Sequence, residues 1–386
     1  MLKARIVQHR SRVQGSLRSR MLAMASELDD VITLGRGDPD FDAPAHVVEA
    51  AAAAMAAGDT HYTLPAGLPE LREAIAGKLR TDNGLDYAAD EVVVTNGCQE
   101  ALYLLIQALI GPGDELLLQE PRYNAYDHMV SLAGGSVVSV PTTQELDFAL
   151  TADDVAARIT PRTKAIAIVT PNNPTGGVIP PARLAELAEL CVDRDLIVIS
   201  DEIYEKLMYD GLEHVSLATF PGMRERTITV NGFAKAYAMT GLRVGYFAAP
   251  REFAAAVVEV KHTMSICTAT PMQQAALAAL TGPQSAVEEM RRAYDERRQA
   301  LMQALDDMDL TYGHPGGGMY IYANVASTGL DSEEFCLRLL REEGVMIFPG
   351  TLFGDPKTDH VRITLLQSLD DIVRATARMK RFIANI

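Results

Sequence analysis

Between about residues 44 and 280, short apolar runs alternate with segments whose apolar residues recur at helical spacing. The apolar runs, which we expect to be strands, are Val92–Thr95, Glu115–Gln119, Val137–Val140, Ala165–Thr170, Leu196–Ser200, Thr227–Val230 and Arg243–Ala248. The helical segments between them include Glu100–Leu109, Pro181–Cys191 and Arg251–Lys261. Strands that are apolar at consecutive positions are typical of a sheet buried on both faces. The pattern therefore predicts an α/β domain with a mostly parallel sheet flanked by helices.

The pattern changes after Pro283, where a long charged helical segment runs from Ala286 to about Met308. A strand and helix unit then continues to the last residue. A length of 386 residues suggests two or three structural units at about 150 residues each. Because a long helix leaving a sheet connects domains, we expect a large domain over residues 43–283. We expect a smaller α+β domain built from both termini, residues 1–42 and 284–386.

Composition and charge argue against several classes of protein. Apolar residues make up 48% of the chain and charged residues 22%, which are values of globular proteins. The 35 Lys and Arg against 51 Asp and Glu give a net charge of −16, which repels nucleic-acid phosphates. No apolar run approaches the ~20 residues that span a membrane. We therefore expect neither a nucleic acid nor a membrane as a partner.

The cysteines and histidines favour a cytoplasmic protein without a metal centre. The four cysteines lie far apart and form no C-x-x-C pair, which favours reduced thiols over disulfides or zinc. The eight histidines show no H-E-x-x-H spacing. The first 26 residues carry six Lys and Arg before the first acid, Glu27, which is also the composition of a mitochondrial transit peptide. We favour a basic N-terminal arm, and the targeting segment stays as the alternative.

The strongest chemical signal is the segment 230–246, VNGFAKAYAMTGLRVGY. It places Lys235 just after a predicted strand, with Arg243 eight residues later. A lysine held among Phe233, Tyr237 and Met239 is partly desolvated, which makes the neutral amine available for Schiff-base chemistry. A solvated surface lysine is the default interpretation of any single lysine. Further motifs decide against it here.

Three motifs follow predicted strands, at the edge where ligands bind in open α/β sheets. They are Thr95–Glu100 (TNGCQE), Thr170–Gly176 (TPNNPTG) and Ser200–Tyr204 (SDEIY). The first offers free backbone N–H groups at a helix start, which suit a phosphate. The second is a fixed turn whose Asn amide is free to donate. The third holds a carboxylate that needs a cation if it is buried.

Together these motifs resemble those of the class I and II aminotransferases, the fold-type I enzymes that depend on pyridoxal 5'-phosphate (PLP). The match extends in order from about Leu34 to Leu365. Motifs in the right order over most of a chain are more specific than any one pattern. The resemblance implies the fold-type I architecture and a PLP aldimine on Lys235.

The resemblance also implies how the cofactor ring is held. Asp201 pairs with the protonated pyridine nitrogen, and Asn173 and Tyr204 hydrogen-bond the phenolate oxygen. In Glu120–Tyr126 (EPRYNAY), Tyr123 is the aromatic residue that stacks on the ring. The plain alternatives are a helix N-cap for Asp201, a turn for Asn173 and core aromatic residues for both tyrosines.

For the cofactor phosphate, the resemblance implies three residues at the start of a helix, which are Gly97, Cys98 and Gln99. Arg243 neutralises the phosphate. Gly232 stands three positions before the lysine, where the family often has a hydroxyl residue, so one contact is in question. Tyr62 belongs to a loop that reaches the phosphate of the neighbouring subunit in the family, which implies a homodimer.

Two arginines concern the substrate. Arg362 stands alone in an otherwise uncharged predicted strand, where an unpaired guanidinium is costly to bury. By resemblance it binds the substrate α-carboxylate, together with Gly37 and Asn173. Arg36 departs from the small or apolar residue expected beside Gly37. Arg36 either pairs with a carboxylate on the substrate side chain or points to solvent or to Asp38.

The sequence therefore predicts an aminotransferase that moves an amino group between an L-amino acid and a 2-oxo acid. Lys235, Asp201 and Tyr204 are the expected catalytic residues, and Lys235 carries the proton at the substrate Cα. A lyase, decarboxylase or synthase on the same scaffold is the alternative, because all of these share the chemistry of the lysine. A regulatory protein that keeps the pocket as a sensor is a second alternative, which the acidic charge disfavours.

Overall fold

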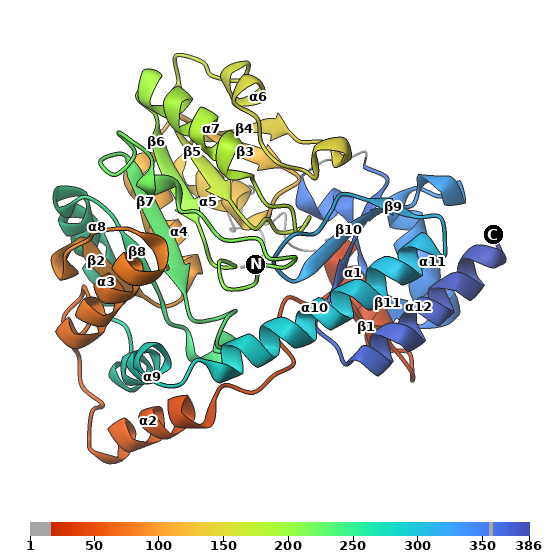
Figure 1. Ribbon diagram of the computed structural model, residues 1–386, viewed down its shortest axis with the longest axis horizontal. Coiled ribbons are helices and arrows are strands. Elements are labelled where there is room, and N and C mark those ends of the chain that lie inside the picture. Colours follow the sequence, from red (N-terminus) through yellow and green to blue (C-terminus); the bar gives the residue numbers. More distant parts are fainter. Residues whose placement is uncertain (1–16, 355–357) are drawn as a thin grey trace, which may run out of the picture.

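The computed structural model describes residues 17–354 and 358–386 and consists of a large sheet with its helices and a smaller group of strands and helices (Figure 1). The basic residues up to Arg12 in the predicted N-terminal arm lie outside the described residues. None of the helices in the described ranges is long and apolar enough to cross a membrane.

The large sheet has seven strands, of which six run in one direction and β8 runs in the opposite direction. Its order is β2 (Val92–Thr95), β8 (Gly245–Ala248), β7 (Thr227–Gly232), β6 (Ile197–Asp201), β5 (Thr163–Val169), β3 (Glu115–Glu120) and β4 (Ser136–Pro141). The mostly parallel sheet confirms the predicted fold class. The predicted strand at Arg243–Ala248 is shorter than expected, because Arg243 has a left-handed backbone (φ 56°) that no strand accommodates.

Helices cover both faces of the sheet, which explains why its strands are apolar at consecutive positions. Ala165 and Ala167 pack in one core with α4 (Cys98–Leu109), α5 (Ala125–Ala133) and α8 (Arg251–Ser265). Ile166 and Ile168 pack in another core with α6 (Ala152–Ala156) and α7 (Pro181–Asp193). A third core joins β2 and β8 to α2 (Ala45–Ala56), α3 (Pro69–Asn83) and α9 (Thr270–Thr281).

The smaller group of elements draws on both ends of the described chain. A four-stranded antiparallel sheet has the order β12 (Phe348–Pro349), β13 (His360–Thr364), β10 (Tyr320–Asn324) and β9 (Thr311–Tyr312). A parallel pair joins β1 (Ile32–Thr33) to β11 (Val345–Met346). The surrounding helices are α1 (Leu17–Ser26), α10 (Ser285–Asp306), α11 (Ser332–Glu343) and α12 (Leu369–Ala384).

One core joins residues of α1 and β1 to residues of α10, α11 and α12, and α10 runs from the large sheet toward this group (Figure 1). The domain boundaries near residues 43 and 283 stay a prediction. Because β5, β6 and β7 are parallel, their carboxyl ends meet at one edge of the large sheet. The three chemical motifs and the lysine segment follow strands of this sheet.

Candidate active site

A cavity of about 670 Å³ lies where the large sheet meets the smaller group of elements. Its lining contains most residues that the sequence singled out. From the large sheet and its loops come Cys98, Gln99, Tyr123, Asn173, Asp201, Tyr204, Lys235 and Arg243. From the segments near the two ends of the chain come Arg36, Gly37 and Arg362.

Asp201 is the last residue of β6 and is 7% exposed. Its Oδ2 accepts a hydrogen bond from the Tyr126 hydroxyl (3.0 Å), and its Oδ1 accepts one from the backbone N–H of Ile203 (3.3 Å). Burial raises the pKa of Asp201 to about 6, although both hydrogen bonds favour the ionised form. A buried carboxylate with two neutral donors is suited to pair with a cation in the cavity.

Lys235 lies in the loop after β7 and is half-buried. Its Nζ donates to the backbone carbonyl of Gly37 (2.5 Å), which belongs to the segment near the N-terminus. This bond crosses the cavity between residues that are 198 positions apart in the chain. The amine is therefore held inside the cavity by a neutral acceptor, which a bound ligand can replace.

Tyr204 is buried, and its hydroxyl lies 3.1 Å from the hydroxyl of Tyr320 in β10. Burial, followed by the neighbouring Tyr320, raises the pKa of Tyr204 well above its ordinary value. The phenol therefore stays protonated at neutral pH. Tyr204 has a proton to donate toward the cavity.

Arg362 of β13 is 5% exposed, and no carboxylate of the described residues pairs with it. Nη2 donates to the Gly35 carbonyl (2.6 Å) and Nη1 to Oδ1 of Asn173 (3.0 Å), while Nε has no partner in the described structure. The guanidinium carbon lies 4.7 Å from the ring centre of Tyr320 and 4.5 Å from that of Phe353. This is a buried cation that lacks an anion, and it leaves the amide NH₂ of Asn173 free to donate.

The start of α4 forms a cradle with Arg243. Gly97 has a left-handed φ of 79°, and a Cβ there would lie 2.8 Å from Nη2 of Arg243. The same Nη2 donates to the Asn96 carbonyl (3.4 Å). Cys98 and Gln99 are the first helical residues, so their backbone N–H groups have no acceptor within the helix. Free N–H groups beside a guanidinium suit a phosphate.

Gly232 is the position where the family often has a hydroxyl residue, and the structure gives a steric reason for the difference. A Cβ at Gly232 would lie 2.9 Å from Sγ of Cys98 and 2.9 Å from Cα of Gly245. Cys98 therefore takes the room that a side chain at 232 would need. Burial raises the pKa of the Cys98 thiol, so Cys98 is a neutral packing residue.

A buried ion pair between Glu100 and Lys261 supports this cradle, and no sequence motif indicated it. Glu100 accepts hydrogen bonds from the backbone N–H and the side chain of Asn96. Nζ of Lys261 in α8 lies 3.3 Å from Oε2 of Glu100, and Lys261 is 0% exposed. The usable signal was Glu100 itself, a charged residue in an otherwise apolar helical segment.

The two remaining tyrosines differ in position. Tyr123 lines the cavity, and its hydroxyl donates to Oε1 of Gln99 (3.4 Å). Tyr62 is 79% exposed and does not line the described cavity. The single chain thus leaves Tyr62 outside its own site.

Arg36 is exposed at the cavity and forms no ion pair with a described residue. Asp38 does not pair with it, and its carboxylate accepts a hydrogen bond from the Thr240 hydroxyl instead. Arg18 of α1 also lines the cavity, and its guanidinium carbon lies 5.2 Å from the ring centre of Phe348.

Arg18, Tyr126 and Tyr320 are among the lining residues to which the sequence motifs gave no role. Arg18 was counted only within the basic N-terminal arm. Tyr126 stands in the same segment as Tyr123, so a second aromatic residue near a motif was the available signal.

Comparison with known proteins gives the family. Residues 29–378 match the family described as Aminotransferase class I and II. The chain is 42% identical to an aspartate aminotransferase of Pyrococcus abyssi, over 94% of each chain. It is 39% identical to aromatic-amino-acid aminotransferase 2 of Thermococcus litoralis, again over 94% of each.

Among solved structures, the aspartate aminotransferase of Thermus thermophilus with maleate superposes with a TM-score of 0.90 at 42% identity, covering 95% of each chain. The chain therefore belongs to the class I and II aminotransferases, PLP-dependent enzymes that transfer an amino group between amino acids and 2-oxo acids.

Proposed function

We propose that the cavity described above is where this aminotransferase works, with each predicted residue in the role that the resemblance implied. The observation that carries the proposal is Arg362, a buried guanidinium that no described carboxylate neutralises. An α-carboxylate fits this position because it supplies the missing charge and accepts two parallel hydrogen bonds. Asn173 accepts a hydrogen bond from Arg362, and Gly37 lines the same cavity.

The residues present also fit PLP. The cradle of Gly97 and Arg243 suits its phosphate, and the buried carboxylate of Asp201 suits its ring nitrogen. Tyr123, Tyr204 and Asn173 line the space between. When bound, PLP supplies an electron sink for the bond that breaks at the substrate Cα.

Lys235 and Asp201 do the chemistry on the protein side. Among the described lining residues, Lys235 carries the one amine, and it takes a proton from the substrate Cα and returns it during transfer. Asp201 stays ionised and holds the proton on the ring nitrogen. Tyr126 supports Asp201, because its hydroxyl stabilises the carboxylate form.

The lining supports a substrate with an acidic side chain. Relatives are named for aspartate and for aromatic amino acids, so the family name leaves the donor open. Arg36 lines the cavity and forms no ion pair with a described residue. We propose that Arg36 binds the distal carboxylate of such a substrate.

The active unit is a homodimer in this proposal. Tyr62 and Leu64, 79% and 54% exposed, project from a loop outside the chain's own cavity. An open, mostly apolar depression beside Gln99 and Arg243 is lined by Met129, Leu132 and Met264. A second copy that covers this depression brings its Tyr62 toward the phosphate cradle.

We also propose a cytoplasmic location. All four cysteines, Cys98, Cys191, Cys267 and Cys336, are free thiols in the structure. Free thiols persist where the cell keeps them reduced.

Lys235→Ala is expected to abolish transamination. Sodium borohydride, which fixes a covalent link between a lysine and PLP, should label Lys235 in the wild-type enzyme, as read by peptide mapping. The matched control is Lys380→Met, which removes an exposed lysine of α12 outside the cavity and should leave the label in place. A label on another lysine would refute the assignment.

Tyr126→Phe is expected to raise the pKa of Asp201 above its value of about 6, because the lost hydroxyl stabilised the ionised carboxylate. Carbon-13 NMR of labelled aspartate in the cofactor-free protein measures it, with Asp201→Asn to assign the signal. Tyr103→Phe, which removes a hydroxyl outside the cavity, is the control. An unchanged or lower midpoint would contradict the proposed support.

Arg36→Ala is expected to lower kcat/KM for glutamate by about ten- to a hundredfold, in line with ~1.5–3 kcal/mol for a charged hydrogen bond, while sparing alanine. Arg36→Lys should keep part of the preference. Steady-state kinetics measures kcat/KM for both amino acids, with pyruvate as the acceptor for glutamate and 2-oxoglutarate as the acceptor for alanine. Equal losses on both substrates would mean that Arg36 only shapes its loop.

Mixing Tyr62→Ala with Lys235→Ala protomers is expected to restore activity at limiting PLP, because each hybrid dimer then has one complete site. Sedimentation should show a particle of two 41.9 kDa chains. Each variant alone is the control. A hybrid no more active than Tyr62→Ala alone would place Tyr62 in its own subunit or in neither site.

A further inference from the structure

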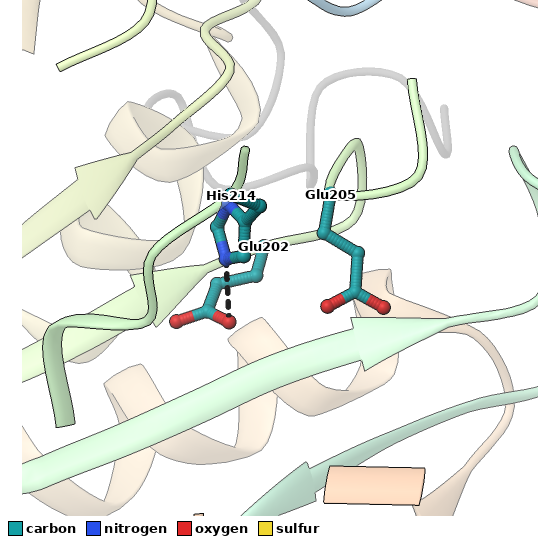
Figure 2. A group of neighbouring side chains, drawn as sticks. All are labelled: Glu202, Glu205 and His214. Atoms are coloured by element: carbon teal, nitrogen blue, oxygen red, sulfur yellow. Dashed lines mark hydrogen bonds and ion pairs between the residues drawn. The ribbon is translucent and has the colours of Figure 1, made fainter. Parts of the chain in front are cut away.

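The turn that carries Asp201 and Tyr204 also carries two buried glutamates that lie outside the cavity lining. Asp201 and Tyr204 line the cavity, whereas Glu202 and Glu205, from the same turn, do not. Glu202 and Glu205 lie near His214 in the protein interior (Figure 2). Glu202 is 0% and Glu205 9% exposed, so both carboxylates are buried.

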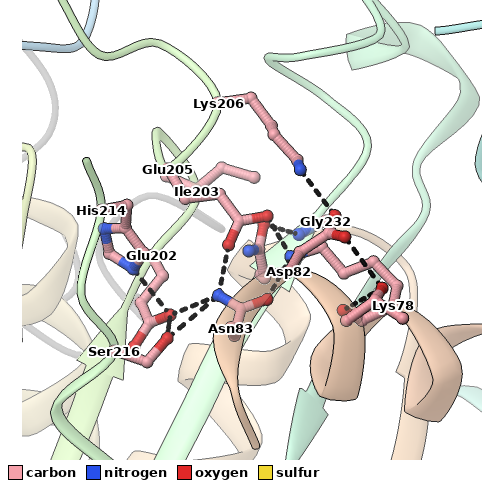
Figure 3. A network of polar contacts seen from close by, with 12 residues as sticks. Lys78, Asp82, Asn83, Glu202, Ile203, Glu205, Lys206, His214, Ser216 and Gly232 are labelled. Carbon is pink, nitrogen blue, oxygen red and sulfur yellow. Dashed lines mark hydrogen bonds and ion pairs between the residues drawn. The ribbon is translucent and has the colours of Figure 1, made fainter. Parts of the chain in front are cut away.

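Glu205 is anchored to the end of α3. Lys78 forms an ion pair with its Oε1, and Asn83 donates from Nδ2 to its Oε2 (2.6 Å). Lys78 also donates to Oδ1 of Asn83 (2.6 Å), which closes a three-membered set of contacts (Figure 3). All of these groups are almost fully shielded from solvent.

Glu202 is anchored in three directions. Its Oε2 lies 2.9 Å from Nε2 of His214 and accepts from the Ser216 hydroxyl (2.6 Å), while its Oε1 accepts from the Ser200 hydroxyl (2.9 Å). Asn83 donates to Oγ of Ser216 (3.0 Å), which links the two glutamates into one network (Figure 3). The network thus ties α3, the turn after β6 and the segment 214–216 together.

Each buried glutamate of this network faces a group that can carry a positive charge. Burial opposes ionisation of Glu205, yet the charges of Lys78 and His214 together with hydrogen bonds from Lys78 and Asn83 outweigh it and lower the pKa of Glu205 to about 2. Burial likewise opposes protonation of His214, but the nearby Glu202 raises the pKa of His214. The network thus sets Lys78 opposite Glu205 and His214 opposite Glu202.

A metal ion is the other chemistry that the spacing suggests. Ligand atoms of Glu202, Glu205 and His214 lie within 4.8 Å of one another. The Lys78 ammonium, however, already occupies the cation position on Glu205, and Asn83 and Ser216 donate to the remaining oxygens. The carboxylate oxygens of Glu202 and Glu205 are therefore already occupied by donors, which disfavours a metal ion here.

We propose that Lys78, Asn83, Glu202, Glu205, His214 and Ser216 form a positioning network that holds Asp201 and Tyr204 in their working orientation. The inference rests on the proposed roles of those two residues. The turn after β6 has no regular secondary structure of its own, so side-chain contacts decide its geometry. A fully satisfied buried polar network permits one arrangement and makes others costly.

Loss of Lys78 leaves Glu205 as an unpaired buried charge. Such a carboxylate either takes up a proton or pulls the turn toward water, and both outcomes displace Tyr204 next to it. A displacement of about 1 Å in a catalytic group can cost about 10²-fold in rate. The network thereby acts on the reaction without touching substrate or cofactor.

The test compares Lys78→Met with Lys206→Met in the PLP-loaded enzyme. Lys206 belongs to the same turn and pairs with Asp82 of α3 (2.6 Å), but the side chains of both members of this pair are one-third exposed (Figure 3). Lys78→Met is expected to lower kcat about 10²-fold with a smaller change in KM, and to shift the pH midpoint of the bound-cofactor absorption. Lys206→Met should change neither, and Lys78→Arg should restore part of kcat.

Ser216→Ala serves as the milder variant if Lys78→Met does not fold, and it should lower kcat in the same direction. A variant that only unfolds at lower temperature, with wild-type kcat and absorption, would reduce the network to a structural role. Restoration of Lys78→Met activity by added divalent cations would favour the metal instead. An inactive wild-type enzyme would refute the proposed function, whereas an active wild type with an equally active Lys78→Met would refute only this inference.

Discussion

A single carboxylate, Asp201, has to remain at the buried end of a central strand, and much of the structure serves that constraint. Burial alone favours the protonated form, and raises its pKa to about 6. The Tyr126 hydroxyl and the Ile203 N–H oppose this by donating to the two oxygens. A cation in the cavity would complete the balance, and the proposed function assigns that place to the protonated ring nitrogen of PLP.

Arg362 is a second buried charge that lines the cavity, and its charge is opposite to that of Asp201. Arg362 is buried without an anion, and carbonyl and amide oxygens together with aromatic rings hold it in place. Lys235 of the large sheet reaches the carbonyl of Gly37 near the N-terminus, so it joins segments from both parts of the chain. In the proposed function, Arg362 binds the substrate α-carboxylate and Asp201 pairs with the ring nitrogen of PLP, so the two buried charges hold substrate and cofactor separately.

Behind this cavity, charged residues that make no contact with it form a second layer. Glu202 and Glu205 alternate with Asp201 and Tyr204 along one short turn, and their partners come from α3 and from the segment 214–216. Glu100 and Lys261 form a similar buried pair beside the cradle proposed for the phosphate, where Glu100 accepts a hydrogen bond from Asn96. Buried ion pairs of this kind add little net stability but specify one geometry, which suits groups that must stay in place during catalysis.

The sequence by itself determined the fold class and most of the cavity. Consecutive apolar strands predicted the parallel sheet because both of its faces are covered. The motifs after β5, β6 and β7 predicted Asn173, Asp201 and Lys235 as cavity residues through their resemblance to those of the class I and II aminotransferases, at strand ends where ligands bind in open α/β sheets. Only the tertiary structure decided that Tyr126 donates to Asp201, that Lys78 neutralises Glu205, and that Cys98 fills the space above Gly232. These contacts join residues tens to more than a hundred positions apart through packing of the side chains, which no local pattern records.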